Sequence, residues 1–166
     1  PSHWLKLRNL SNLGLTEGLH LMPNHWSASI TSGMVITFLA CLMIVATDIG
    51  SYFLGLNFGR HPLSPISPSK TVEGAIGGLI CSMTIGSLSG ILLKWKLGFI
   101  IGGLLGALVA LFALVGDLTE SMMKRNAGLK DSGDAIPGHG GILDRIDSYL
   151  FTPAVVYYTL ILLIPT

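Results

Sequence analysis

Long uncharged apolar runs are the feature of this sequence that most restricts its fold. They cover approximately residues 29–47, 74–93, 97–116 and 149–164, the last of which is short and contains Pro153. Crossing a hydrocarbon core about 30 Å thick takes roughly 20 apolar residues in a helix. Within lipid, a helix satisfies its own backbone hydrogen bonds, whereas an open strand does not. The runs therefore predict an all-α integral membrane protein, built as a bundle of about four transmembrane helices.

Composition and charge agree with this prediction and exclude one class of partner. Half of the 166 residues are hydrophobic and 11% are charged, compared with about 25% charged residues in soluble domains. The formal net charge is +1, while a basic nucleic-acid-binding surface needs a clustered excess of Lys and Arg. Cys41 and Cys81 lie inside apolar runs, where a thiol packs as a small hydrophobic group. We expect the lipid bilayer as a partner, and no nucleic acid.

The glycines of these runs follow a helical spacing. They recur four residues apart at Gly74 and Gly78, at Gly86 and Gly90, and at Gly98, Gly102 and Gly106. Small residues at this spacing let two membrane helices approach closely. The pattern is common in membrane helices, and it indicates a compact bundle rather than chemistry.

The first 28 residues differ from the rest of the chain. They mix Trp, His and basic side chains with short apolar stretches and Pro23, as interfacial segments do. We therefore divide the chain into an interfacial segment, residues 1–28, and a transmembrane domain, residues 29–166. Because the sequence starts at Pro1 instead of Met, we expect it to be part of a larger multi-span protein.

Four spans distribute the connections over two sides of the membrane. One side holds the amino-terminal segment and the turn 94–96, and the other holds the long loops 56–73 and 118–148. The first side carries Lys6, Arg8, Lys94 and Lys96. The second side carries more basic residues, namely Arg60, Lys70, Lys124, Arg125, Lys130 and Arg145. Connections rich in Lys and Arg tend to stay in the cytosol. We expect a multi-pass protein of the plasma or another inner membrane, with two long cytosolic loops.

Two acidic residues are expected where membrane spans meet the long loops. Asp48 follows the first apolar run directly, and Asp117 follows the third. Charged residues at such positions are costly in a membrane protein and indicate function by default. A carboxylate at the carboxyl end of a helix also opposes the helix dipole, so a cation should compensate it. A metal ion and a nearby Lys or Arg are both candidates for that cation.

Polar residues continue beyond Asp117 on one helical face. Asp117, Ser121 and Lys124 have the i, i+4, i+7 spacing of a shared face. A solvated helix end with a salt bridge between Glu120 and Lys124 explains the same pattern. The glycine-rich segment that follows, residues 126–147, favours a functional site, because glycine lets backbone N–H groups approach an anion closely.

This glycine-rich segment carries charges of both signs. Its cations are Lys130, His139 and Arg145, which add to Lys124 and Arg125, and its acids are Asp131, Asp134, Asp144 and Asp147. A ligand that combines phosphates with Mg²⁺ would compensate both, because the phosphates can bind the basic side chains and Mg²⁺ the acidic ones. Mg²⁺ typically takes one or two protein carboxylates and completes its coordination shell with phosphates and water. Asp144 and Asp147, three residues apart, can face such a site together.

The other long loop leads into the second span with a second set of polar residues. We expect Pro62, Pro65 and Pro68 to hold this loop extended. Ser or Thr followed by Glu is a common helix cap, and a helix amino terminus that carries Lys, Ser and Thr also suits an anion. Both interpretations apply to Ser69, Lys70, Thr71 and Glu73.

The run SMMKRNAGLKDSGDAIPGHGGILDRID, residues 121–147, resembles the signature of the phosphatidate cytidylyltransferases, also called CDP-diacylglycerol synthases. The matching positions are Ser121, Lys124, Arg125, Lys130, Asp131, Pro137, His139, Gly140, Gly141, Asp144, Arg145 and Asp147. The sequence from residue 47 onwards is similar to the preceding region of the same family. The resemblance therefore covers roughly residues 47–147.

The resemblance implies an enzyme of phospholipid biosynthesis that transfers the cytidylyl group from CTP to phosphatidate, with Mg²⁺, and forms CDP-diacylglycerol and pyrophosphate. Residues 29–166 would form its catalytic transmembrane domain, with the active site facing the cytosol. The nucleophile would be the phosphate monoester of the lipid, whose second pKa of about 6 leaves it largely ionised at neutral pH, so no general base is required. A second, monovalent cation and a homodimer are left open.

On this interpretation the candidate residues take distinct roles. Asp117, Asp144 and Asp147 are expected to bind the metal, and Lys124 joins them as a catalytic residue. Substrate binding falls to Ser69, Lys70, Ser121, Arg125, Lys130, Asp131, His139, Gly140, Gly141 and Arg145, with Asp48 and Glu73 as second-tier candidates. The alternative for Asp147 is an ion pair with Lys130 or Arg125.

Two other functional classes stay open. A CTP-dependent polyprenol or phytol kinase would phosphorylate a lipid alcohol and release CDP instead of pyrophosphate. A transporter or structural membrane protein would line a path near the bilayer midplane with its charges. Product analysis separates the kinase from the transferase, and a lack of CTP binding would favour the transporter.

Overall fold

The computed structural model describes residues 2–9, 32–64, 67–95, 97–129, 133 and 143–163. This part of the chain is mostly helical and contains one small β-hairpin. The elements are α1 (Ser2–Arg8), α2 (Ser32–Phe58), β1 (Pro62–Ser64), β2 (Ser67–Thr71), α3 (Val72–Leu92), α4 (Gly98–Asn126) and α5 (Leu143–Leu163). The antiparallel hairpin, in which Pro62 pairs with Thr71, is the one departure from an all-α architecture within the described residues.

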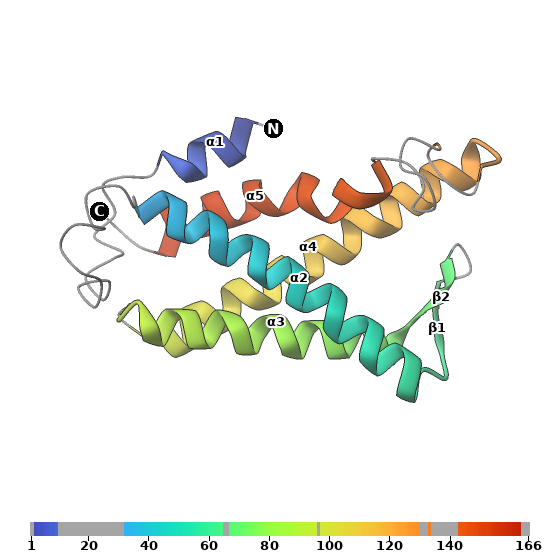
Figure 1. Ribbon diagram of the computed structural model, residues 1–166, viewed down its shortest axis with the longest axis horizontal. Coiled ribbons are helices and arrows are strands. Elements are labelled where there is room, and N and C mark those ends of the chain that lie inside the picture. The colour runs from blue at the N-terminus through green and yellow to red at the C-terminus, as the bar shows by residue number, and fades with distance from the viewer. Residues whose placement is uncertain are drawn as a thin grey trace.

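The four long helices run back and forth between two ends of the bundle (Figure 1). One end carries the β-hairpin and the last turns of α2 and α4, and the opposite end carries the turn between α3 and α4. Helix α1 packs against α2 and α5, and its Leu7 is fully buried. The central core consists of Leu7, Ile36, Ala40, Met43, Ile44, Leu105, Val109, Val156 and Leu160.

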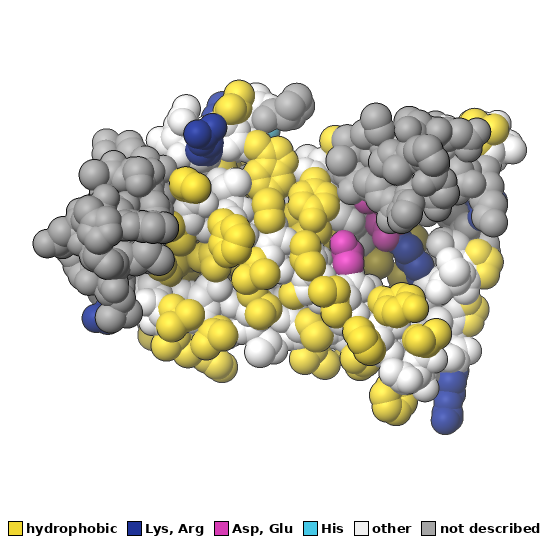
Figure 2. All heavy atoms as spheres, in the orientation of Figure 1, with side chains coloured by type: hydrophobic (Ala, Val, Ile, Leu, Met, Phe, Trp, Pro, Cys, Tyr) yellow, Lys and Arg dark blue, Asp and Glu magenta, His cyan; other side chains and the backbone are white. Residues whose placement is uncertain are grey.

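Three of these helices are long and apolar enough to cross a membrane. They cover Gly33–Phe58, Val72–Leu92 and Gly98–Asn126. Large hydrophobic side chains are exposed on all three, and they cover much of the face seen in Figure 2. An exposed apolar surface of this kind suits contact with lipid. The chain is therefore a membrane protein, as expected from the apolar runs at 29–47, 74–93 and 97–116.

Asp48 does not lie at the carboxyl end of its helix, contrary to the expectation from the sequence, whereas the helix of the third apolar run continues beyond Asp117, as its polar face predicted. Helix α2 continues to Phe58, ten residues beyond Asp48, and α4 continues to Asn126, nine residues beyond Asp117. One Asp costs a helix no more than about 0.7 kcal/mol relative to Ala, so a charge does not end a helix whose neighbours favour it. Both carboxylates lie inside helices, and the argument from the helix dipole does not apply to them. The long loops are correspondingly shorter than 56–73 and 118–148.

The glycine pattern is confirmed as a packing feature, with Gly74 and Gly78 against α2 and the other five glycines between α3 and α4. A Cβ atom on Gly86 would lie 2.2 Å from the carbonyl oxygen of Gly102, and one on Gly90 would lie 2.0 Å from that of Gly98. The hydroxyl of Ser82 donates a hydrogen bond of 2.8 Å to the carbonyl of Gly106. Direct backbone contact of this kind holds the two helices in a fixed register.

Candidate active site

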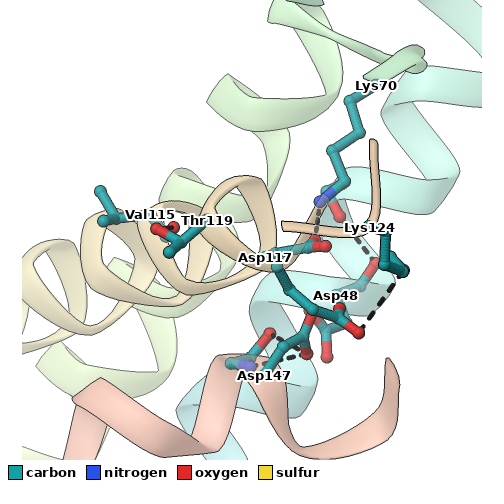
Figure 3. A network of polar contacts seen from close by, with 10 residues as sticks. Asp48, Lys70, Val115, Asp117, Thr119, Lys124 and Asp147 are labelled. Atoms are coloured by element: carbon teal, nitrogen blue, oxygen red, sulfur yellow. Dashed lines mark hydrogen bonds and ion pairs between the residues drawn. The ribbon is translucent and has the colours of Figure 1, made fainter. Parts of the chain in front are cut away.

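Charged side chains from three helices and the hairpin meet in the half of the bundle nearer the hairpin. They are Asp48 on α2, Asp117, Glu120 and Lys124 on α4, Asp147 on α5 and Lys70 on β2. Figure 3 shows Lys70 extending from the hairpin towards Asp117, with Asp48 and Asp147 facing the same place. We refer to these six residues as the charged cluster. In Figure 2, magenta and dark-blue side chains lie next to one another at this end of an otherwise largely apolar face.

Three carboxylates of the charged cluster are arranged as metal ligands would be. Oxygen atoms of Asp117, Glu120 and Asp147 all lie within 4.8 Å of one another. Glu120 and Asp147 are buried, with 5% and 7% of their surface exposed. A set of oxygen donors fits a hard divalent cation such as Mg²⁺. Glu120 was not among the predicted ligands, although its i, i+3 spacing from Asp117 places both carboxylates on one face of α4.

Helix α5 can bring Asp147 to this set because α4 has a glycine at the crossing. A Cβ atom on Gly116 would lie 2.6 Å from the carbonyl oxygen of Asp147. The Oδ1 atom of Asp147 accepts hydrogen bonds from the backbone N–H of Ser148 at 2.6 Å and from its hydroxyl at 3.3 Å. Within the described residues, Asp147 forms no ion pair with Arg125.

Lys70 supplies the compensating cation for Asp117. Its Nζ atom forms an ion pair with Oδ2 of Asp117, and 25% of the Lys70 side chain is exposed. Burial lowers the pKa of the Lys70 ammonium, while the negative charges of Asp147, Asp48 and Glu120 act in the opposite direction. A nearby Lys was one of the two cations considered from the sequence for Asp117, and Lys70 is that residue.

Lys124 is the second lysine of the charged cluster. Its Nζ atom is 3.5 Å from Oε1 of Glu120, one helical turn earlier. The salt bridge expected for an ordinary helix end is therefore present, but the partner carboxylate is buried within the charged cluster. Ser121 is half-buried on the same helix, and Arg125 is exposed.

The hairpin that carries Lys70 is fastened to the start of α3. Oε2 of Glu73 accepts hydrogen bonds from the backbone N–H groups of Arg60 and His61, at 3.2 and 3.3 Å. Oε1 of Glu73 is 2.7 Å from Nδ1 of His61. The hydroxyl of Thr71 caps α3 by accepting a bond of 3.1 Å from the N–H of Gly74. Glu73 thus holds the base of the hairpin and lies apart from the charged cluster.

A cavity of about 500 Å³ begins at the charged cluster. Its polar end includes Asp48, Lys70, Asp117, Ser69 and Ser148. The remaining walls come mainly from apolar side chains of α2, α3 and α4, among them Leu56, Ile76, Leu79, Leu111 and Leu114. One cavity therefore offers a charged end and an apolar body.

Several predicted site residues lie outside the described part of the chain. These are Lys130, Asp131, His139, Gly140 and Gly141. Asp144 and Arg145 belong to the first turn of α5, but the description does not extend to their side chains. Their roles stay predictions, as does the ion pair between Asp147 and Lys130.

Comparison with known proteins gives consistent matches. The sequence pattern of the cytidylyltransferase family matches residues 11–163. A phosphatidate cytidylyltransferase of Synechocystis sp. is 49% identical over 99% of this chain and 59% of the relative. The chloroplastic phosphatidate cytidylyltransferase 4 of Arabidopsis thaliana is 44% identical over 95% of this chain and 41% of the relative. The phosphatidate cytidylyltransferase of Bacillus subtilis is 41% identical over 78% of this chain and 49% of the relative. The chain spans about half the length of these relatives.

Proposed function

Because this chain belongs to the cytidylyltransferase family, we propose that it forms the catalytic part of a phosphatidate cytidylyltransferase. The reaction transfers the cytidylyl group of CTP to phosphatidate and yields CDP-diacylglycerol and pyrophosphate. The observation that carries the proposal is the cavity with a charged end and an apolar body. A nucleotide triphosphate and a lipid phosphate both need cations, and a diacylglycerol body needs apolar walls.

The lipid is proposed to bind with its phosphate at the hairpin side of the cavity. Lys70 and Ser69 line this end, and a lysine on a flexible stem is a suitable point charge for a phosphate. The acyl chains would lie along the apolar walls formed by α2, α3 and α4. Removing their surface from water contributes about 25 cal/mol per Å² to binding.

The nucleotide is proposed to bind on the α4 and α5 side. Lys124 and Arg125 lie in the last turns of α4, where their charges can face a triphosphate. Arg145, with Ser121 and the glycine-rich segment 126–147, is assigned to the same substrate. Because the lipid phosphate is itself an ionised nucleophile at neutral pH, the chain needs to orient two anions and does not need to remove a proton.

The donor set of Asp117, Glu120 and Asp147 supports a proposed Mg²⁺ site, with Asp144 as a further ligand. When bound, Mg²⁺ would supply neutralisation of the α-phosphoryl group and of the pyrophosphate leaving group. Asp117 and Glu120 approach from α4 and Asp147 from α5, so the contact between these helices determines the ligand spacing. A second, monovalent cation is retained as a prediction.

We also propose the membrane topology expected from the sequence, with α5 as a fourth span. The hairpin and the carboxyl end of α4 lie at the same end of the bundle (Figure 1), which supports the assignment of both connections to the cytosol. The active site would then face the cytosol of a multi-pass protein in the plasma or another inner membrane. A homodimer stays a prediction.

The position of the charges argues against a transporter. On α2, α3 and α4, the charged residues described lie in the half of each helix nearer the hairpin: Asp48, Glu73, Asp117, Glu120, Lys124 and Arg125. A transport path needs polar groups near the bilayer midplane and access from both sides. Within α2, α3 and α4, no described residue in the other half of the helix is charged.

Product analysis tests the proposal against the lipid kinase. The full-length protein in nanodiscs receives phosphatidate, Mg²⁺ and CTP labelled at either the α or the γ phosphorus. We expect the α label in the lipid product and the γ label in pyrophosphate. In a parallel reaction that also contains a polyprenol, a kinase would instead transfer the γ label to this alcohol and leave the α label in CDP; that result would refute the proposal.

A further inference from the structure

We propose that Lys70 is an exchangeable internal cation, which neutralises Asp117 in the empty enzyme and leaves it when Asp117 ligates a divalent metal. Lys70 is then available to the phosphate of a substrate. The inference rests on the proposed function, because it assigns the same carboxylate to a metal. It adds an order to binding, in which the metal precedes the lipid phosphate.

The first support is that one carboxylate serves two sets of contacts. Asp117 is the ion-pair partner of Lys70, and it also belongs to the carboxylate set with Glu120 and Asp147. The Nζ atom of Lys70 is shielded from solvent. An ammonium group and a divalent cation repel each other, and both would bind the same carboxylate, that of Asp117. Lys70 and a bound metal therefore compete for Asp117.

The second support is the balance of charge. Within the charged cluster, four carboxylates face two lysines, which leaves a formal charge of −2 from the described side chains (2 − 4). With a divalent cation bound and Lys70 withdrawn, the sum would be −1 (3 − 4), which is less negative than in the empty cluster. Buried charge without compensation is unfavourable, so the empty cluster retains Lys70, and the metal-loaded cluster no longer requires it.

The third support is that the exchange needs movement of a side chain only. Residues around Lys70 are held in place by the hydrogen bonds of Glu73 and by the cap of Thr71 on α3. The lysine side chain itself has four flexible methylene groups. Lys70 and Ser69 both line the cavity, so a change of rotamer can carry the ammonium group from Asp117 to a phosphate there.

The test measures metal affinity directly, using Mn²⁺ and electron paramagnetic resonance on the full-length protein in nanodiscs without substrates. Coupling between two ligands is reciprocal, and typical coupling changes an affinity at least about five-fold. We therefore expect Lys70→Met to bind Mn²⁺ at least about five-fold more tightly than the wild type. Lys70→Arg keeps the positive charge and should bind Mn²⁺ as the wild type does. The matched control, Lys94→Met, changes an exposed lysine at the opposite end of the bundle.

A second readout follows Lys70 itself. Acetylation of Lys70 by an amine-reactive reagent, quantified by mass spectrometry, should increase when Mn²⁺ is added to the wild type. Subsequent addition of phosphatidate should reduce it again. Acetylation of Lys94 should not change in either step.

The outcomes separate this inference from the proposed function. If Asp117→Asn abolishes Mn²⁺ binding but Lys70→Met binds Mn²⁺ no more tightly than the wild type, the exchange is refuted while the metal site stands. Weaker binding by Lys70→Met would mean that Lys70 supports the metal site, which also refutes the exchange. If the wild type binds no Mn²⁺, both the metal site and the exchange are wrong.

Discussion

Glu73 shows how a residue outside the charged cluster can control it. Its carboxylate joins the backbone of Arg60 and His61 to the first turn of α3, and the strand that begins at Ser67 and carries Lys70 returns to the same point. The position of the Lys70 side chain therefore depends on three hydrogen bonds at the base of the hairpin. We therefore expect Glu73 to act through Lys70, as a positioning residue.

We expect Glu73→Ala to lower kcat/KM for phosphatidate about ten-fold, which corresponds to ~1.4 kcal/mol of transition-state stabilisation. The KM for phosphatidate should rise more than the KM for CTP, since the hairpin is proposed to bind the lipid phosphate. Glu73→Gln retains an acceptor and should recover part of the loss. Steady-state kinetics of the full-length protein, with Asn57→Ala as an exposed control on α2, measure both effects. Equal increases in the two KM values would contradict the assigned role.

At the residue scale, the sequence predicts Asp117, Asp147, Lys70 and Lys124 as site residues, and the structure brings these four together. It does not predict Glu120 as a ligand candidate, because a carboxylate with an i+4 lysine has an ordinary explanation on the helix surface. Only the fold changes that interpretation, because Glu120 is buried and its carboxylate lies near that of Asp147 on α5.

At the scale of elements, the crossing of α4 and α5 determines the spacing of the carboxylates. Gly116 lies directly before Asp117, and the carbonyl of Asp147 occupies the space that a side chain at residue 116 would need. A methyl group there would force the two helices apart. The distance between the carboxylates of Asp117 and Asp147 would increase as a result.

We expect Gly116→Ala to reduce kcat/KM about 100-fold, or ~2.7 kcal/mol, while the protein still folds, since overpacking of this size typically costs about 1–3 kcal/mol. Gly103→Ala on the same helix is the control. Its Cβ atom would meet only the Ser87 hydroxyl, at 2.7 Å, and that side chain can rotate away. Activity and thermal unfolding are measured together for both variants. Similar activity in the two would show that the close crossing is not needed.

The elements also show where apolar patterns stop being informative. The apolar runs correctly predict α2, α3 and α4 as membrane helices, but α2 continues about three turns beyond its apolar run. The continuation of α4 beyond its apolar run follows instead from the polar face of Asp117, Ser121 and Lys124. Backbone hydrogen bonding continues past a charged residue, whereas a count of uncharged residues stops at it. The prolines do indicate an extended segment, since Pro62 and Pro68 lie in β1 and β2, and Pro65 is outside the described residues.

At the scale of the whole molecule, four long helices and a hairpin combine a polar site with an apolar environment. The site lies inside helices α2 and α4 and opens into a cavity with apolar walls. Such a cavity depends on contacts among residues far apart in the chain, and no local pattern predicts it. The family resemblance predicts the substrates, but it does not predict the position of the site relative to the helix ends.

The central claim is that carboxylates from two separate helices form one site for cytidylyl transfer. The most direct measurement is phosphatidate-dependent release of pyrophosphate from CTP by full-length Asp117→Asn and Asp147→Asn, compared with Asn57→Ala. We predict that each Asp variant loses at least about 1,000-fold in kcat, or ~4 kcal/mol, while remaining folded in the membrane, and that Asn57→Ala retains full activity. Turnover within about ten-fold of the wild type in either Asp variant would contradict a shared site.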